Sequence, residues 1–323
     1  MLLTHLPRLR SLRRYCREQI EARRRAAVIG AYTETNCAFD GKRAFSHVKN
    51  LVNIGPRPAG SAKLALARRY ITNELQSYGL KIVNDEFIAQ TPSGAVTMVN
   101  ITAEIPGTSS DCIIIASHYE TKVFKEFEFV GANDGGSSTG ALLELARTLP
   151  TRRKVLPFTY QLVFFDGEEA FCRDWDDCGT QDAPDNTYGS RHHVAQLIAQ
   201  KRLKNVRAMV LLDMIGYRNL KFGRDSLSTG WLLDLIWQTA RELNCGAQFI
   251  GRNEDVGGDD HLPFLAAGID AVDIIQVNSY PYWHTPEDTL DKISARSLKL
   301  VGDVVLASLP RIERHLLKQH AAE

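Results

Sequence analysis

Apolar residues recur along the chain in short segments that alternate between the spacing of a helix and that of a strand. From Ser61 to Tyr78 they fall at three- and four-residue steps, which places them on one helix face, and Gly79 follows where such a helix would end. Short β-branched runs come next, at Lys81–Phe87 and Val96–Ile101. This part of the chain is therefore predicted to form a helix followed by two strands.

Four later runs are apolar without interruption, as expected of strands that are buried on both faces of a sheet. These runs are Cys112–Ala116, Tyr160–Phe165, Ala208–Leu212 and Ala271–Val277. Helical spacing accompanies them at Ser137–Leu149, Tyr188–Ala199, Trp231–Leu243, His261–Ala267 and Ala295–Leu317. The alternation predicts an α/β fold, with a doubly wound, largely parallel central sheet that is flanked by helices on both faces.

One folded domain accounts for the length and the composition of the chain. Its 323 residues fit a single large α/β core, and the sequence contains neither an internal repeat nor a Pro-, Gly- or Ser-rich linker. Hydrophobic residues make up 44% and charged residues 24%, as in an ordinary globular protein. We expect a basic helical segment over residues 1–43 and one folded domain over residues 44–323.

The basic segment is the one asymmetry of charge in the sequence. Its arginines are Arg8, Arg10, Arg13, Arg14, Arg17, Arg23, Arg24 and Arg25. The apolar run Ala26–Ala31 that follows is shorter than the ~7–15 residues of a signal-peptide core. As written, the sequence therefore predicts a cytoplasmic protein, whereas a leader encoded at another start would make it periplasmic or secreted. No run reaches the ~18 apolar residues that cross a bilayer, and a formal net charge of +1 gives no reason to expect nucleic acid as a partner.

The six cysteines are scattered, and none has the paired spacing of a structural zinc site. Cys112 falls inside a predicted strand and is interpreted as a small core residue. Cys172 and Cys178 flank a polar loop, and the sequence leaves open whether they form a disulfide.

Acidic and histidine side chains follow the predicted strands at the point where each strand ends. His118 and Glu120 follow the first buried run, Glu168 and Glu169 follow the second, and Asp213 follows the third. Asp134 opens the helix at Ser137, and His284 comes after the last strand. Because ligands of doubly wound folds bind beyond the carboxyl ends of the strands, we expect these side chains to converge there.

Convergence favours a metal site over the ordinary alternatives, which are a helix N-cap for Asp134 and a loop acid for Asp213. Carboxylates gathered at one sheet edge repel one another unless a cation lies between them. Oxygen and imidazole ligands without thiolates suit a catalytic zinc ion with an open coordination position. Of the neighbours Glu168 and Glu169, one can bind the metal while the other moves protons.

Six ordered motifs, specific as a set, resemble those of the zinc aminopeptidases with co-catalytic metals and of their single-zinc relatives, the animal-type glutaminyl cyclases. The resemblance runs from about Ala44 to Leu316. The motifs are Ser117-His118-Tyr119, Gly131-Ala132-Asn133-Asp134, Asp166-Gly167-Glu168-Glu169-Ala170, Leu211-Leu212-Asp213, Asp259-Asp260-His261-Leu262-Pro263-Phe264 and Trp283-His284-Thr285.

The resemblance implies a set of metal ligands. In the aminopeptidases, residues matching His118, Asp134 and Asp213 hold one zinc, and those matching Asp134, Glu169 and His284 hold the other. The cyclases keep the same residue types and hold one zinc, at the second of these sites. Ligand identity therefore does not separate the two activities.

Other features resemble the cyclases more than the aminopeptidases. These are Lys122 and Phe124, Trp175 soon after Glu169, the run Tyr188–His192, the double acid Asp259-Asp260, and Trp283 directly before His284. Two features depart from the cyclase pattern: Glu120 stands where an Asp is usual, and the loop Cys172–Asp182 is longer. If that loop covers the site, substrate preference is expected to differ.

The activity that the resemblance implies is glutaminyl-peptide cyclotransferase, which converts the N-terminal glutamine of a peptide to pyroglutamate and releases ammonia. Glu168 would be the general acid/base, Asp213 and Asp259 its catalytic partners, and Trp175 and Trp283 walls of the substrate pocket. One Zn²⁺ per chain and a monomer are expected. The alternative is a zinc aminopeptidase with two zinc ions, and a non-catalytic relative is disfavoured because no ligand is missing.

Three further histidines are not expected to bind the metal. His261 lies beside the acids at the start of a predicted helix and is interpreted as a hydrogen-bonding neighbour of the site. His192 and His193 are interpreted as ordinary helix residues.

Overall fold

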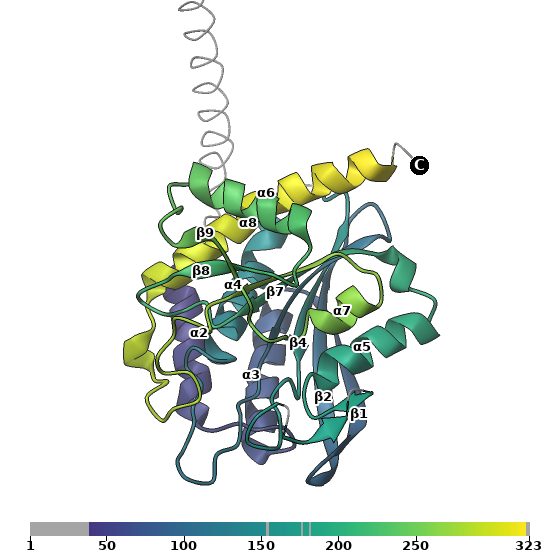
Figure 1. Cartoon of the computed structure of the whole chain (residues 1–323). Coiled ribbons are helices and arrows are strands. Elements are labelled where there is room, and N and C mark those ends of the chain that lie inside the picture. The colour runs from purple at the N-terminus through teal and green to yellow at the C-terminus, as the bar shows by residue number, and fades with distance from the viewer. Residues whose placement is uncertain (1–38, 153–154, 176, 181, 321–323) are drawn as a thin grey trace, which may run out of the picture. The chain divides into compact units, whose positions relative to one another are not determined.

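A twisted six-stranded sheet forms the centre of the computed structural model, which describes residues 39–152, 155–175, 177–180 and 182–320 (Figure 1). The strands are β1 (Lys81–Thr91), β2 (Gly94–Ile105), β3 (Cys112–His118), β4 (Thr159–Phe165), β7 (Val206–Asp213) and β10 (Ala271–Ile275). Their order across the sheet is β1-β2-β4-β3-β7-β10. The pairs β4-β3, β3-β7 and β7-β10 are parallel, whereas β2 runs antiparallel to both of its neighbours. The predicted α/β class and largely parallel sheet are confirmed.

Helices cover both faces of this sheet, as predicted. One face carries α2 (Gly41–Ile54), α3 (Ala62–Ser77), α4 (Gly136–Arg152), α6 (Gly230–Glu242) and α8 (Ala295–His320). The other carries α5 (Tyr188–Ala199) and the short α7 (Leu262–Ala266). Side chains of β4 alternate between the two cores, with Leu162 in the larger core and Val163 in the smaller one. The buried runs are fully apolar because helices pack on both of their faces.

The first two strands are longer than predicted and form an antiparallel hairpin. The pairing runs from Lys81 opposite Glu104 to Thr91 opposite Gly94, across a two-residue turn. β1 lies at the edge of the sheet and much of it is exposed. The predicted run ended at Phe87 and missed residues 88–91, because an edge strand requires little burial and its apolar pattern is therefore weak.

Several elements were not predicted. Helix α2 begins after Asp40, whose side chain accepts hydrogen bonds from the backbone N–H groups of Lys42 and Arg43. The pair β8 (Phe222–Asp225) and β9 (Phe249–Glu254) is parallel, and β5 (Gly179–Thr180) and β6 (Ala183–Pro184) form a short hairpin. Two 3₁₀ turns, Leu203–Asn205 and Leu290–Lys292, complete the described elements.

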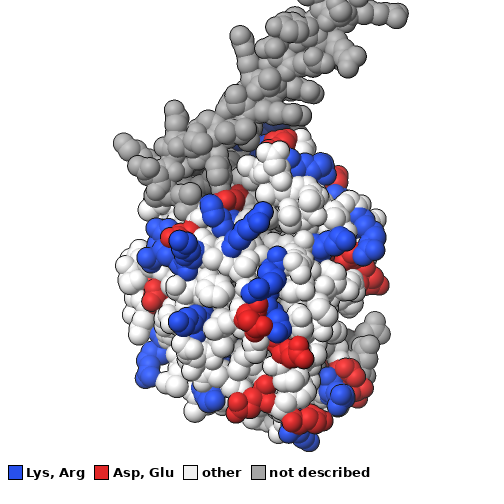
Figure 2. All heavy atoms as spheres, turned by 90° about the vertical axis from the view of Figure 1, so that its left-hand side faces the viewer, with Lys and Arg blue, Asp and Glu red and all other residues white. Residues whose placement is uncertain are grey.

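The compact unit begins at Phe39, ahead of the boundary at residue 44 expected from the sequence. Most of the predicted basic segment, residues 1–38, lies outside the described residues. In the part of the chain that the structure describes, no helix has the length and apolarity needed to cross a membrane. Figure 2 shows Lys and Arg side chains interspersed with Asp and Glu on one face of the molecule.

Candidate active site

The strand ends deliver a cluster of three side chains that could hold a metal ion. Asp134 lies just before α4, Glu169 lies in the turn after β4, and His284 lies in the segment after β10. Nε2 of His284 is 3.2 Å from Oε1 of Glu169 and 3.5 Å from Oδ2 of Asp134. One ligand atom from each residue lies within 4.8 Å of the other two. The geometry thus brings together the three ligands predicted from the sequence.

The electrostatics of this cluster fit a cation. Burial alone would lower the pKa of His284, but the charges of Glu169 and Asp134 raise it to about 10. Burial would likewise raise the pKa of Asp134, yet the nearby imidazoles of His118 and His284 hold it well below its usual range. Oδ2 of Asp134 is buried and has no hydrogen-bond partner among the described residues. Two carboxylates and an imidazole in this arrangement are a suitable donor set for a divalent metal with an open position.

A second cluster shares Asp134 with the first. Nε2 of His118, at the end of β3, is 3.2 Å from Oδ1 of Asp134 and 3.2 Å from Oδ1 of Asp213, at the end of β7. These three residues also offer ligand atoms within 4.8 Å of one another. Asp134 therefore belongs to two three-residue clusters. One contains His284, and the other contains His118.

Local backbone geometry makes this crowding possible. Gly135 has φ +65°, and a Cβ at this position would lie 2.6 Å from the backbone oxygen of Glu120 and 3.0 Å from Cε1 of His118. Only glycine fits such a close approach. His284 itself has φ 54°, a left-handed conformation that is rare for residues other than glycine and is frequent at functional sites.

Glu168 occupies a different environment from its neighbour Glu169. Its Oε2 is 3.8 Å from Nδ1 of His118, and the side chain lines the same cavity as the first cluster. Burial raises the pKa of Glu168 well above its usual range; His118 opposes this rise, while Glu169, Asp259 and Asp260 add to it. A buried carboxyl group with a raised pKa beside a metal cluster is suited to accept and return a proton.

The turn that carries both glutamates is held by Glu120. Its Oε1 accepts hydrogen bonds from the backbone N–H groups of Glu168, at 2.5 Å, and Glu169, at 3.1 Å. Burial would raise the pKa of Glu120, but the imidazole of His118, with Nδ1 3.7 Å from Oε1 of Glu120, brings it below the usual value. The acid that departs from the cyclase pattern therefore orients the two carboxylates through their backbone.

Asp213 and Asp259 line the cavity together with Glu168. Burial raises the pKa of Asp259 well above its usual range, and the charges of Asp213 and Asp260 add to this effect. Burial also raises the pKa of Asp213, although His118 opposes the rise. Oδ2 of Asp259 is buried without a hydrogen-bond partner among the described residues. These acids can therefore share protons or receive a cationic group.

Two tryptophans, which were predicted to be walls of a substrate pocket, form part of the cavity wall. Trp175 and Trp283 both line the cavity that contains Asp134, Glu169 and His284. Trp283 is 43% exposed, and its ring stacks on His284 at a centroid distance of 4.3 Å. Large aromatic surfaces at the mouth of an acidic cavity are suited to contact the apolar parts of a substrate.

Asp288 was not predicted from the sequence, and its carboxylate holds the backbone at Asp134 by hydrogen bonds. Its Oδ1 accepts from the backbone N–H of Asn133 at 2.9 Å, and its Oδ2 accepts from that of Asp134 at 3.0 Å. The hydroxyl of Tyr280 also donates to Oδ1 of Asp288, at 2.5 Å. No spacing in the sequence relates Asp288 to Asp134, so only the folded chain reveals this contact.

Asp288→Asn is expected to weaken metal binding about 10- to 100-fold, since residues that orient ligands typically contribute this much. The amide nitrogen cannot accept the backbone N–H bonds that fix Asp134. Chelator competition on purified protein measures the affinity. Tyr280→Phe serves as the control, because it removes one hydroxyl and leaves both backbone bonds in place. An affinity for Asp288→Asn equal to that of wild type would contradict this role.

The contact between Lys122 and Glu169 was also not predicted from the sequence. The ammonium of Lys122 is buried, donates to the backbone oxygens of Ala170, at 2.9 Å, and Cys172, at 3.2 Å, and lies 3.7 Å from Oε2 of Glu169. In the sequence, Lys122 stood out only as a point of resemblance to the cyclases. In the structure it links Glu169 to the segment that follows.

Three histidines that were not expected to bind the metal, His192, His193 and His261, belong to none of the candidate ligand groups among the described residues. His261 is fully buried at the start of α7, with Nε2 3.3 Å from Oδ2 of Asp225 and Nδ1 3.9 Å from Oδ2 of Asp273. His192 and His193 both lie on α5; His192 pairs with Asp85, and His193 is buried.

The chain is similar to known enzymes in both sequence and fold. Residues 100–309 match the model of peptidase family M28. The structure of a glutaminyl cyclase from an Acidobacteriales bacterium is 36% identical, with a TM-score of 0.79, covering 86% of this chain and 96% of that one. The glutaminyl-peptide cyclotransferase of Bos taurus is 30% identical over 77% of this chain and 76% of its own length. A leucine aminopeptidase precursor from Bacteroides thetaiotaomicron is 27% identical, with a TM-score of 0.77, covering 85% of this chain and 98% of its own.

The fold and the acid-rich cavity at its strand ends define an enzyme of the metal-dependent peptidase M28 class. The chain belongs to peptidase family M28 and, within it, to the glutaminyl cyclases.

Proposed function

We propose that this chain is a glutaminyl-peptide cyclotransferase that acts as a monomer and uses one zinc ion held by Asp134, Glu169 and His284. Its substrates are peptides that begin with glutamine. The observation that carries the proposal is that two adjacent carboxylates lie in different surroundings. Glu169 belongs to a three-ligand cluster, while Glu168 lines the same cavity beside His118. All of these side chains come from one chain, so the site requires no second copy.

The donor set supports zinc over a metal that needs more ligands. One imidazole nitrogen and two carboxylate oxygens match a catalytic zinc site, which keeps a fourth position open for substrate. When bound, zinc would polarise the side-chain carbonyl of the substrate glutamine and stabilise negative charge on its oxygen.

Glu168 is positioned to move the proton that the reaction requires. The α-amine of the substrate attacks its own side-chain amide, so that a C–N bond forms within the peptide and the bond to the amide nitrogen breaks. Glu168 accepts a proton from the attacking amine and returns it to the nitrogen that leaves as ammonia. Burial raises the pKa of Glu168, and the charges of Glu169, Asp259 and Asp260 add to this rise, while His118 opposes it. Asp213 and Asp259 line the same cavity, where their carboxylates can hold the substrate amine beside Glu168.

A zinc aminopeptidase is the second candidate, because the cluster of His118, Asp134 and Asp213 offers a complete second set of ligands. The similarity to a leucine aminopeptidase precursor also supports it. Two observations favour the cyclotransferase. The first is that the curated Bos taurus relative and the Acidobacteriales structure both bear cyclase names at 30% identity or more. The second is that the indoles of Trp175 and Trp283 lie on the wall of the cavity, where the resemblance to the cyclases places them.

One assay separates the two activities. Purified protein, analysed for metal content, is incubated with a Gln-initiated peptide and with a Leu-initiated peptide of otherwise identical sequence, and the products are followed by mass. We expect loss of ammonia from the first peptide without shortening, and no change in the second. Removal of the N-terminal residue from either peptide would favour the aminopeptidase.

A further inference from the structure

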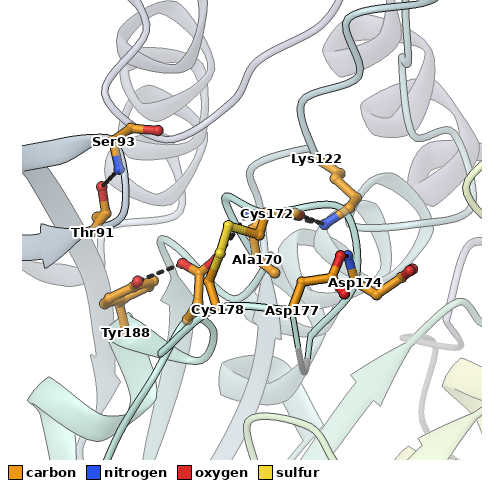
Figure 3. The surroundings of a disulfide bond; sticks show 10 residues. Thr91, Ser93, Lys122, Ala170, Cys172, Asp174, Asp177, Cys178 and Tyr188 are labelled. Carbon is orange, nitrogen blue, oxygen red and sulfur yellow. Dashed lines mark hydrogen bonds between the residues drawn. A yellow bond between two sulfur atoms is a disulfide. The ribbon is translucent and has the colours of Figure 1, made fainter. Parts of the chain in front are cut away.

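A disulfide-closed loop contributes a continuous part of the cavity wall. Cys172 and Cys178 form a disulfide, with their Cα atoms 6.0 Å apart, which settles the alternative that the sequence left open (Figure 3). The loop starts three residues after Glu169. Three consecutive residues within it, Arg173, Asp174 and Trp175, line the cavity that contains the metal cluster.

One end of this loop is fixed to the buried framework of the site. The backbone N–H of Cys172 donates to Oδ2 of Asp185 at 2.8 Å, and the ammonium of Lys122 donates to the backbone oxygen of Cys172 at 3.2 Å. Asp185 is buried and accepts a hydrogen bond from the hydroxyl of Tyr188. The disulfide ties the other end of the loop, at Cys178, to this fixed point. The covalent bond thus restricts how far the wall can move from the cavity.

Inside the loop, hydrogen bonds place Asp174 and Trp175. The backbone N–H of Asp174 donates to Oδ2 of Asp177 at 3.0 Å, and the backbone N–H of Asp177 donates to the backbone oxygen of Asp174 at 3.2 Å. The indole of Trp175 reaches the opposite wall, since a Cβ at Gly258 would lie 3.9 Å from its Cζ3. Asp174 is exposed, and in Figure 3 its side chain points away from the disulfide.

This wall carries charges of both signs, and the rest of the cavity is acidic. Arg173 and Asp174 both line the cavity, and the guanidinium of Arg173 lies 3.4 Å from a carboxylate oxygen of Glu126, which partly offsets its charge. Asp174 and Asp177 add two exposed carboxylates within the loop. Deeper in the cavity, Oδ2 of Asp259 lacks a hydrogen-bond partner among the described residues, although its side chain is only 2% exposed. The cavity therefore offers negative charge both inside, where an N-terminal ammonium would lie, and at its mouth.

We propose that the Cys172–Cys178 loop determines which residue is accepted after the N-terminal glutamine, with Asp174 favouring a cationic side chain there. The proposal rests on the cyclotransferase function. Consecutive Cα atoms are ~3.8 Å apart, so a glutamine that reaches the metal cluster places its successor near the mouth of the cavity. The disulfide is a positioning element, because it acts through Asp174 and Trp175 and not on the reacting atoms.

Three peptides that differ only in the second residue test the preference: Gln-Lys, Gln-Ala and Gln-Glu at their N-termini. For wild-type protein, kcat/KM is expected to fall in this order by about two- to fivefold a step, mainly through KM, because exposed ion pairs are weak. High salt is expected to compress the differences. Asp174→Asn should abolish most of the difference between Lys and Glu. Asp182→Asn, an exposed acid beyond the disulfide that does not line the cavity, should retain it.

The double variant Cys172→Ser/Cys178→Ser tests the positioning role without a thiol reductant, which would itself bind zinc. We expect KM to rise several-fold for all three peptides, with kcat within about twofold and zinc content unchanged, because the ligands do not depend on the disulfide. Adding Asp174→Asn to this variant should change the charge preference less than it does in wild type, since residues that act together are not additive.

The outcomes distinguish this inference from the function on which it rests. If zinc-loaded protein cyclises none of the peptides, the proposed function fails. If it cyclises all three with equal kcat/KM, or if Asp174→Asn keeps the wild-type ranking, only the inference about the loop is wrong. An unchanged KM in the cysteine variant would remove the positioning role of the disulfide while leaving that of Asp174 intact.

Discussion

Glu168→Gln is expected to retain its metal and to lose at least two orders of magnitude in kcat. Glutamine keeps the shape and the hydrogen-bonding capacity of the side chain but cannot accept a proton at the amide nitrogen. A positioned general base typically contributes ~10²- to 10⁴-fold to the chemical step. The metal is expected to remain because Glu168 lies outside the cluster formed by Asp134, Glu169 and His284.

Steady-state kinetics with a Gln-initiated peptide and metal analysis of the same preparation measure this effect. KM is expected to change much less than kcat, because the lost interaction is one that acts in the transition state. Glu86→Gln, at an exposed position on β1, makes the same chemical change away from the site and should leave both constants near the wild-type values. Turnover above about a tenth of wild type in Glu168→Gln would transfer the role to Asp213 or Asp259.

The pH dependence of wild-type kcat/KM provides a second check on Glu168. A base must be ionised to accept a proton, so activity is expected to fall as the pH drops through its pKa. Burial and the neighbouring acids raise the pKa of Glu168 above the ~4.3 of an ordinary glutamate, although His118 opposes the rise. The acid limb should therefore lie above this value, and it should be absent from the residual activity of Glu168→Gln.

Removing a ligand of the proposed zinc site is expected to remove both metal and activity. Glu169→Ala and His284→Ala each leave two of the three ligands, one of them the shared Asp134. Bound zinc after gel filtration should fall from about one per chain to a small fraction, and turnover should fall with it, because a bound zinc would polarise the reacting carbonyl. Full zinc occupancy in either variant would rule out the assigned ligand.

His118→Ala separates the one-zinc site from a two-zinc site. His118 belongs only to the second cluster, with Asp134 and Asp213. If one zinc suffices, the variant should keep its metal and lose less activity than His284→Ala. His192→Ala, which makes the same replacement on α5, controls for the loss of a histidine as such. Two zinc atoms per wild-type chain, both needed for turnover, would instead favour the aminopeptidase.

The sequence by itself determined the buried strands and much of the site. β3, β4 and β7 were predicted to within two residues because each is buried on both faces, so that an unbroken apolar run marks it. Helix α5 was predicted with its observed ends, Tyr188 and Ala199. His118 and Asp213 come at or next to the last residue of a strand, and parallel strands bring their carboxyl ends to one edge. Local pattern and this topological rule were therefore sufficient to group the candidate ligands.

The tertiary structure decided what depends on contacts between distant segments. The antiparallel pairing of β2 with β4 and the contact of Asp288 with the backbone of Asp134 join residues whose relation no local spacing encodes. The same is true of Asp134 lying between His118 and His284, because each pair is separated by a different number of residues and meets only at the sheet edge. The disulfide needed the Cα separation of Cys172 and Cys178, which a six-residue spacing permits but does not impose. Periodicity reports burial and local conformation, whereas side chains from separate elements meet only where packing of the whole core places them.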